Sequence, residues 1–371
     1  MRTLLKLMVL AAALLVGGWI LGETLLARGL RSAIAEDPRI EASDVTPLRE
    51  AGRIGVRLHE LLFFDPDLAL QTGWLDLFVP PTAPNAVHLA LAPGTRLSGD
   101  GGLLVLGPSG AEAEMHLSPI HGLAPSRARL VLVAPRINGL EAASSLRLEA
   151  RLGRPDADAP PETGAAYAID AMLMGLSLDA VTGHAATGNV SIAGRGQVWL
   201  DHLPMSVGRM FSGAPARDAP HLLGLRLDQV RVTLDGLALT LRGRLVADNE
   251  GRASGALLID TADAAAIVAR GADLGLLPDT AVPLVTTVLG NLAEPQTEGS
   301  DRDDSEASPS ILMQAPADMP SGSAEPMMPD SLLSGWPKPA PGEQRLVIWF
   351  HAGKGYLGQM PIGPAPQMVQ R

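Results

Sequence analysis

From Pro47 onward, apolar and polar residues alternate with a period of two, and this alternation constrains the fold more than any other feature of the chain. Successive side chains of a β-strand point to opposite faces of its sheet, so the pattern predicts strands with one apolar and one polar face. It starts at Ile54, Val56 and Leu58, which alternate with Gly55 and Arg57. Clusters of Gly, Pro, Asp and Asn separate the segments and predict turns. The sequence therefore predicts a mainly β fold, an antiparallel and curved sheet with a few short helices.

The stretch from residue 225 to residue 260 shows the alternation most clearly. Asp235-Gly236 separates two alternating runs, and the glycine supplies the positive φ that a type I′ hairpin turn requires. Asp248-Asn249-Glu250-Gly251 predicts the next turn, and a further strand is expected at Ala256 to Ile259. The stretch is thus predicted to be an antiparallel meander. Two short helices are expected after it, the first capped by Thr261 and the second by Asp279 or Thr280.

The N-terminal segment predicts a membrane anchor. Leu7 to Gly22 form an unbroken apolar run, and residues 4 and 5 extend it to roughly the 20 residues that cross a bilayer. Ala33-Ile34-Ala35 has the form of a signal-peptidase site but lies far beyond the apolar run, so a retained anchor is favoured over a cleaved signal peptide. Residues 1–35 are therefore predicted to be a transmembrane anchor in the bacterial inner membrane, crossing through residues 4–22, with a helical extension. Because Arg2 and Lys6 precede the run, the C-terminal domain is expected in the periplasm.

A change of composition divides the rest of the chain. Between Pro295 and Gly342 prolines and acidic residues replace the alternation, which predicts a disordered insertion over 295–342. Strands are expected again at Gln344 to His351 and Gly355 to Met360, and two strands are too few to fold alone. We therefore expect one periplasmic β-rich domain, made of residues 36–294 and 343–366.

Several classes of function are disfavoured by the composition. A formal net charge of -11 argues against nucleic acid as a partner, since phosphate binding needs a basic surface. The absence of cysteine excludes thiolate catalysis and cysteine-based metal sites. The run from Gly353 to Gly358 fits GxGxxG, but the prolines that follow it exclude the helix of a dinucleotide site, so a hairpin turn is predicted. No catalytic, cofactor-binding or metal-binding residue is predicted, and no cofactor.

One apolar cluster is a candidate for binding. Trp199, Met205, Met210 and Phe211 gather around a proline-containing segment after a central strand. These four residues predict either core packing or the rim of an apolar groove.

Three parts of the sequence resemble a known family. They are the N-terminal anchor, the run LDGLALTLRGRLVADNEGRASGALLI at Leu234 to Ile259 and the ending GKGYLGQMPIGPAP at Gly353 to Pro366. Together they resemble the alphaproteobacterial, membrane-anchored proteins of the domain of unknown function 2125 family. The resemblance implies a topology and no known activity. The meander is also similar to the curved sheets of AsmA-like envelope proteins, which is an analogy of fold alone.

Three hypotheses for function follow. The first is a non-enzymatic protein that maintains or assembles the envelope through contacts with protein partners. The second is a carrier that binds lipid or another apolar ligand along the apolar face of the sheet. The third is an envelope enzyme. A covered apolar face favours the first hypothesis, and an open one favours the second.

Overall fold

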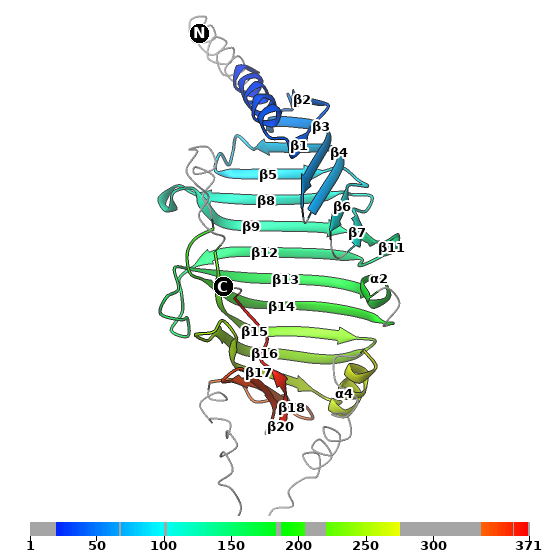
Figure 1. The fold of residues 1–371 in the computed structure, drawn as a ribbon, viewed down its shortest axis with the longest axis vertical. Coiled ribbons are helices and arrows are strands. Elements are labelled where there is room, and N and C mark those ends of the chain that lie inside the picture. The colour runs from blue at the N-terminus through cyan, green and yellow to red at the C-terminus, as the bar shows by residue number, and fades with distance from the viewer. Residues whose placement is uncertain are drawn as a thin grey trace, which may run out of the picture.

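The computed structural model describes residues 20–66, 68–99, 102–182, 187–204, 220–274, 335–358 and 360–369, and its twenty strands form one sheet (Figure 1). The first eleven strands are β1 (Ile40–Glu41), β2 (Asp44–Pro47), β3 (Ile54–Asp65), β4 (Leu68–Val79), β5 (Ala86–Leu91), β6 (Arg96–Gly99), β7 (Gly102–Val105), β8 (Ala111–Ser118), β9 (Ala124–Val133), β10 (Arg136–Ile137) and β11 (Leu140–Glu141). The remaining nine are β12 (Ser145–Gly153), β13 (Ala165–Ser177), β14 (Asn189–Leu200), β15 (Leu222–Leu234), β16 (Leu237–Ala247), β17 (Ala253–Thr261), β18 (Gln344–His351), β19 (Lys354–Leu357) and β20 (Met360–Pro364). The helices are residues 20–36, the 3-10 turn η1 (Pro119–His121), α2 (Leu178–Thr182) and α4 (Ala264–Asp273).

All strand pairs are antiparallel, and the main ladder runs β2, β3, β4, β5, β8, β9 and then from β12 to β20 in chain order. The N-terminal part of β4 pairs with β3 on one side and with β6, not β5, on the other, and β6 continues through β7 and β10 to β11. Within the described residues the first strands do not pair with the last, so the sheet is open. The predicted antiparallel, mainly β architecture is confirmed.

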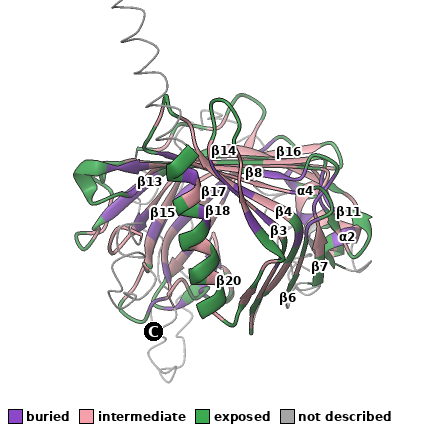
Figure 2. Ribbon diagram, turned by 90° about the horizontal axis from the view of Figure 1, so that it is seen from above, coloured by how far each residue is buried: buried purple, intermediate pink, exposed green. Residues whose placement is uncertain are grey.

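Alternation along each strand gives the sheet two chemically different faces. Leu146 of β12 pairs with Leu132 of β9 on one side and with Leu173 of β13 on the other, so like residues form rows across the strands. We call the face that carries these leucines the inner face and the opposite one the outer face. Figure 2 shows the helix of residues 20–36 inside the curve of the sheet, and this helix packs on the apolar side of β3 and β4. The apolar face is therefore the concave one.

Glycines on the inner face allow neighbouring strands to approach closely where the sheet bends. A Cβ atom at Gly194 would lie 2.5 Å from the Cα of Val230, and one at Gly243 would lie 2.3 Å from the carbonyl oxygen of Ala256. Side chains converge on the concave side of a bent sheet, and glycine relieves that crowding. Glycine at these two positions therefore allows the sheet to curve.

Helices cover the inner face at both ends of the ladder. Ala27 of the helix of residues 20–36 packs in one cluster with Val56 and Leu58 of β3. The fully buried Glu23 fixes this helix, because its carboxylate accepts the backbone N–H of Gly55 at 2.9 Å and that of Arg49 at 3.2 Å. At the other end, Val268 of α4 packs against Ile259 and Leu346.

The cap of α4 differs from the prediction. The Oδ1 atom of Asp263, not the hydroxyl of Thr261, accepts the backbone N–H of Ala266 at 2.9 Å. Thr261 instead donates its hydroxyl to the carbonyl oxygen of Ala238 at 3.0 Å, because it still belongs to β17. The second predicted helix, with its cap at Asp279 or Thr280, lies outside the described residues.

The predicted turns and the strand from Gln344 to His351 are confirmed, whereas the predicted strand from Gly355 to Met360 is divided between β19 and β20, with a turn at Gly358. Asp235 and Gly236 have φ of 49° and 90°, as a type I′ turn between β15 and β16 requires. Ala352 and Gly353 have φ of 47° and 76° between β18 and β19, so the GxGxxG run begins in a hairpin turn. Strand β18 pairs with β17, which joins the C-terminal strands to the preceding sheet.

Two further predictions concern parts of the chain that are only partly described. Among the described residues no helix combines the length and apolar character needed to cross a bilayer, and most of the predicted span, 4–22, precedes residue 20. Of the predicted insertion 295–342, the structure describes residues 335–342. Pro337 in this segment accepts a hydrogen bond from Arg345 at 2.6 Å, which attaches the segment to β18.

Candidate functional site

Among the residues that the structure describes, the inner face has no charged side chain from β5 to β16. Its rows follow the strand register, so that Leu148, for example, lies between Leu130 and Ala171. The side chains are those of Val87, Leu89, Leu91, Ala111, Ala113, Met115, Ala128, Leu130, Leu132, Leu146, Leu148, Ala150, Leu152, Tyr167, Ile169, Ala171, Leu173, Ile192, Val198, Leu225, Leu227, Val230, Val232, Leu239, Leu241 and Leu245. The face is therefore an apolar surface that extends across the whole ladder.

Coverage of the inner face differs between its ends and its middle. Beneath the helix of residues 20–36, Val56 is fully buried and Leu58 is 6% exposed. In the middle of the ladder, Leu148 is 38% exposed and Met115 is 37% exposed, although both point to the same face. The described residues thus leave apolar side chains of the middle strands in contact with solvent.

The inner face also offers little hydrogen bonding. Its backbone groups are paired in the antiparallel ladders, so they are not free to bind a ligand. The hydroxyl of Tyr167 is engaged too, because it donates to the carbonyl oxygen of Pro125 at 2.7 Å, and burial raises the pKa of this phenol. A ligand for this surface must therefore be apolar where it touches the sheet.

Ion pairs cover much of the outer face. Arg57 binds Asp76 through two hydrogen bonds of 2.6 and 2.7 Å, and Glu149 lies between Arg151 at 2.5 Å and Arg127 at 2.7 Å. Hydrogen bonding to Arg151, followed by that to Arg127, lowers the pKa of the Glu149 carboxyl, and partial burial opposes the shift.

The strongest charge cluster of the outer face is buried at its C-terminal end. Asp260 is fully buried between Arg242 and Arg345, and the latter binds both of its carboxylate oxygens, at 2.6 and 2.8 Å. The carboxylate thus bridges three strands, β16, β17 and β18.

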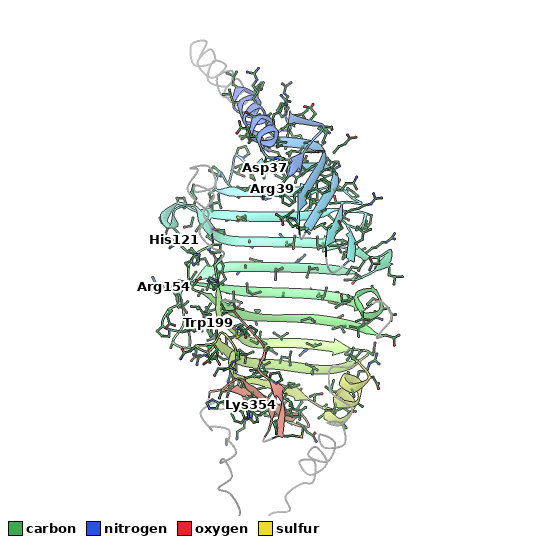
Figure 3. The ribbon with its side chains drawn as sticks, viewed as in Figure 1. Asp37, Arg39, His121, Arg154, Trp199 and Lys354 are labelled. Atoms are coloured by element: carbon green, nitrogen blue, oxygen red, sulfur yellow. The ribbon has the colours of Figure 1, made fainter. Side chains whose placement is uncertain are left out.

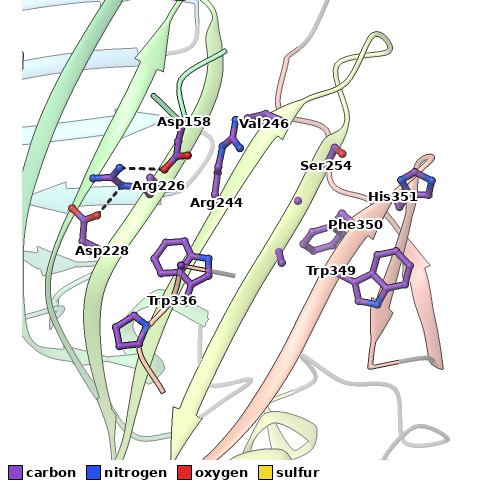
Figure 4. Close-up of a pocket in the computed structure, with 14 residues that line it drawn as sticks. Asp158, Arg226, Asp228, Arg244, Val246, Ser254, Trp336, Trp349, Phe350 and His351 are labelled. Atoms are coloured by element: carbon purple, nitrogen blue, oxygen red, sulfur yellow. Dashed lines mark hydrogen bonds and ion pairs between the residues drawn. The ribbon is translucent and has the colours of Figure 1, made fainter. Parts of the chain in front are cut away.

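A cavity of about 690 Å³ opens beside this cluster on the outer face (Figure 4). It lies over β15 to β18, and the segment of residues 335–337 forms one wall. Two arginines, two aspartates and several aromatic side chains line it, namely Asp158, Arg226, Asp228, Arg244, Trp336, Trp349, Phe350 and His351, with smaller residues between them. This cavity is chemically mixed, in contrast to the inner face.

Only one member of the predicted apolar cluster lies among the described residues. Trp199 is fully buried and belongs to the outer face, where it pairs in register with Ala166 and Gly224. Its Nε1 donates to Gln197 at 2.8 Å, and Gln197 contacts the backbone of Arg154, which lies at the same end of the strands (Figure 3). Met205, Met210 and Phe211 lie outside the described residues, so the groove rim stays a prediction.

Sequence reasoning missed Arg244 as a neighbour of Trp199. The guanidinium of Arg244 lies 5.7 Å from the centre of the Trp199 ring, although the two residues belong to different strands. The register of β14, β15 and β16 brings them together, and the sequence alone does not give that register. The pattern Arg-x-Arg at 242–244 was the available signal, because it places two cations on one face.

No cluster of metal ligands occurs in the described part of the chain, where no three His, Cys, Asp or Glu side chains converge. His116 binds Glu114 at 2.5 Å, and His121 binds the hydroxyl of Ser118 at 2.8 Å beside η1. These two histidines thus have separate local partners.

Comparison with known proteins identifies one family. A family model described as an uncharacterized protein conserved in bacteria (DUF2125) matches residues 52–307, which include the strands from β3 to β17 and helix α4. No curated protein and no solved structure matches the chain.

Proposed function

We propose that this chain, which belongs to the DUF2125 family of uncharacterized bacterial proteins, binds the acyl chains of lipids along its inner face. One observation carries the proposal. A row of uncharged side chains runs through ten strands without interruption, and its members are Leu58, Leu75, Leu91, Ala111, Leu132, Leu146, Leu173, Ile192, Val232 and Leu239. At about 4.8 Å between strands, this row is roughly 45 Å long.

Exposed apolar side chains elsewhere on the inner face support a bound partner. Leaving apolar surface in water costs about 25 cal/mol per Å² relative to burial, so large exposed apolar patches are characteristic of binding surfaces. Leu148 and Met115, each more than one third exposed, lie in the middle of the face. A ligand that covers them gains this free energy on binding.

The chemistry of the face favours acyl chains over a protein partner. Protein interfaces carry about one hydrogen bond per 100–200 Å². In the regular parts of the described ladders the backbone donors are paired, and Tyr167 already uses its hydroxyl. An acyl chain needs neither charge nor hydrogen bonds, so the face satisfies it completely.

The position of the helix of residues 20–36 suggests where a lipid enters. This helix covers the inner face at β3, and the chain that precedes it is the predicted membrane segment 4–22. In our proposal the anchor lies in the inner membrane, the sheet lies in the periplasm, and the β3 end of the inner face adjoins the lipid surface. The protein then contributes to envelope maintenance by holding or passing lipid, without catalysis.

Site-specific photo-crosslinking of the full chain in bacterial membranes tests this proposal. A benzophenone amino acid is placed at Leu148 or at Arg147, which are adjacent in β12 but point to opposite faces. We expect lipid adducts by mass spectrometry at position 148 and none at 147. A protein adduct at position 148 would instead support the first hypothesis, contact with an envelope partner. Equal lipid labelling at both positions, or no adduct at 148, would contradict the proposal.

A further inference from the structure

We infer that the cavity on the outer face binds a small organic anion, whose single carboxylate or phosphate group is joined to an aromatic or apolar body. At about 690 Å³ the cavity has the size of a small-molecule site. It lies on the opposite side of the sheet from the lipid-binding surface proposed above, so the two proposals stand or fall separately.

Arg244 is the group that would bind the anion. It pairs in register with Arg226, and the surroundings of these two arginines differ. Arg226 forms ion pairs with Asp156, Asp158 and Asp228. Among the described residues Arg244 forms no ion pair, and its buried Nε has no hydrogen-bond partner. A guanidinium at the cavity wall without a counter-charge can pair with an entering anion.

The guanidinium geometry sets the class of ligand. Its donors form a planar fork that matches the two oxygens of a carboxylate or a phosphate. The guanidinium carbon of Arg244 lies 5.7 Å from the centre of the Trp199 ring. This contact holds the arginine side chain without neutralising its charge. Asp158 and Asp228 line the same cavity and repel further negative charge, so a ligand with one anionic group fits best.

Aromatic side chains provide the surface for the body of the ligand. The Nε1–H of Trp349 donates to the carbonyl oxygen of Gly358 at 2.5 Å. Its ring stacks on that of Tyr356 with 4.4 Å between the ring centres, and the two contacts fix the Trp349 ring at the cavity wall. Trp336 forms part of the facing wall in Figure 4. Flat aromatic or apolar groups bind well to such rings.

The wall that carries Trp336 is held to the sheet. Arg345 donates to the carbonyl oxygen of Pro337 at 2.6 Å, and the same guanidinium binds the buried carboxylate of Asp260. The cavity is therefore built from the sheet and from a segment tied to it by a buried charge.

Binding to the full chain is measured by titration calorimetry with three probes: phenyl phosphate, phenylacetate and the neutral benzyl alcohol. We expect at least one of the two anions to bind with a Kd of about 1 mM or below. Benzyl alcohol should bind about tenfold more weakly or not at all. Phenyl phosphate and phenylacetate distinguish a phosphate ligand from a carboxylate ligand.

Two substitutions of similar chemistry locate the site. Arg244→Met is expected to weaken binding of the anion about tenfold or more. Arg195→Met serves as the control, since Arg195 is exposed on the same outer face of β14 and lies outside the cavity. It should leave the affinity unchanged.

If Arg244→Met fails to fold, which thermal unfolding reveals, Trp336→Ala replaces it, and loss of anion binding is again expected. The inference is overturned if neither anion binds, if benzyl alcohol binds as tightly as the anions, or if the folded Arg244 or Trp336 variant binds like the wild type.

Discussion

The two faces of the sheet share every strand of the ladder but are stabilised by different forces. On the inner face apolar side chains form uncharged rows, and in the described part of the chain helices cover these rows only at the ends. On the outer face arginines and carboxylates pair across strands, and one carboxylate is completely buried. The difference shows that a period of two allows one sheet to combine an apolar surface with a surface whose own charges are mostly paired.

Removal of Asp260 should give the largest effect on the outer face. Asp260→Ala leaves Arg242 and Arg345 close together without their shared carboxylate, and such a break of a buried ion pair costs about 3–5 kcal/mol. Asp170→Ala is the control, because Asp170 is exposed on the same face, and it should change stability by about 0.5 kcal/mol or less. Urea unfolding followed by circular dichroism measures both. Equal effects of the two variants would show that the buried cluster is not structural.

Two leucines should separate the covered end of the inner face from its middle. Leu58→Ala opens a cavity beneath the helix of residues 20–36 and should cost about 2–5 kcal/mol. Leu148→Ala removes a side chain that is already 38% exposed and should cost about 1 kcal/mol or less. The same unfolding measurement compares them. If Leu148→Ala is as costly as Leu58→Ala, the middle of the inner face is covered by protein, and the lipid proposal loses its basis.

The alternation predicted the strands and faces because it is a local property of the sequence. Val230 and Val232 lie on the same face as Leu239 and Leu241, and the Asp235-Gly236 turn sets this register. Curvature was expected only in general terms, since it depends on close backbone approaches such as that at Gly194. The sequence left core packing and a groove rim open for Trp199, and the structure places it buried on the outer face.

The chemically mixed cavity on the outer face could not be predicted from the sequence, for a related reason. Arg244 and Trp199 meet through the register of three strands, whereas Trp336 comes from a segment whose composition predicts disorder. The hydrogen bond from Arg345 to the carbonyl oxygen of Pro337 attaches that segment to the sheet, and no local sequence pattern predicts this contact. Contacts of charged residues with partners distant in the sequence are therefore the feature of the outer face that sequence analysis does not predict.

The smallest expected effect is on the way the outer-face ion pairs make the unfolding free energy depend on pH. The pKa of Glu149 is lowered in the folded protein by its hydrogen bonds with Arg151 and Arg127. A carboxyl group with a lowered folded pKa binds protons more readily in the unfolded state, so its contribution is present above the ordinary value of 4.5 and is lost as pH falls below it. Glu149→Gln should thus make the unfolding free energy less dependent on pH below 4.5. In the described part of the chain the inner face from β5 to β16 carries no carboxylate or histidine, so Leu148→Ala should leave that pH dependence unchanged. A flattened profile in both variants would mean that the faces are not electrostatically independent.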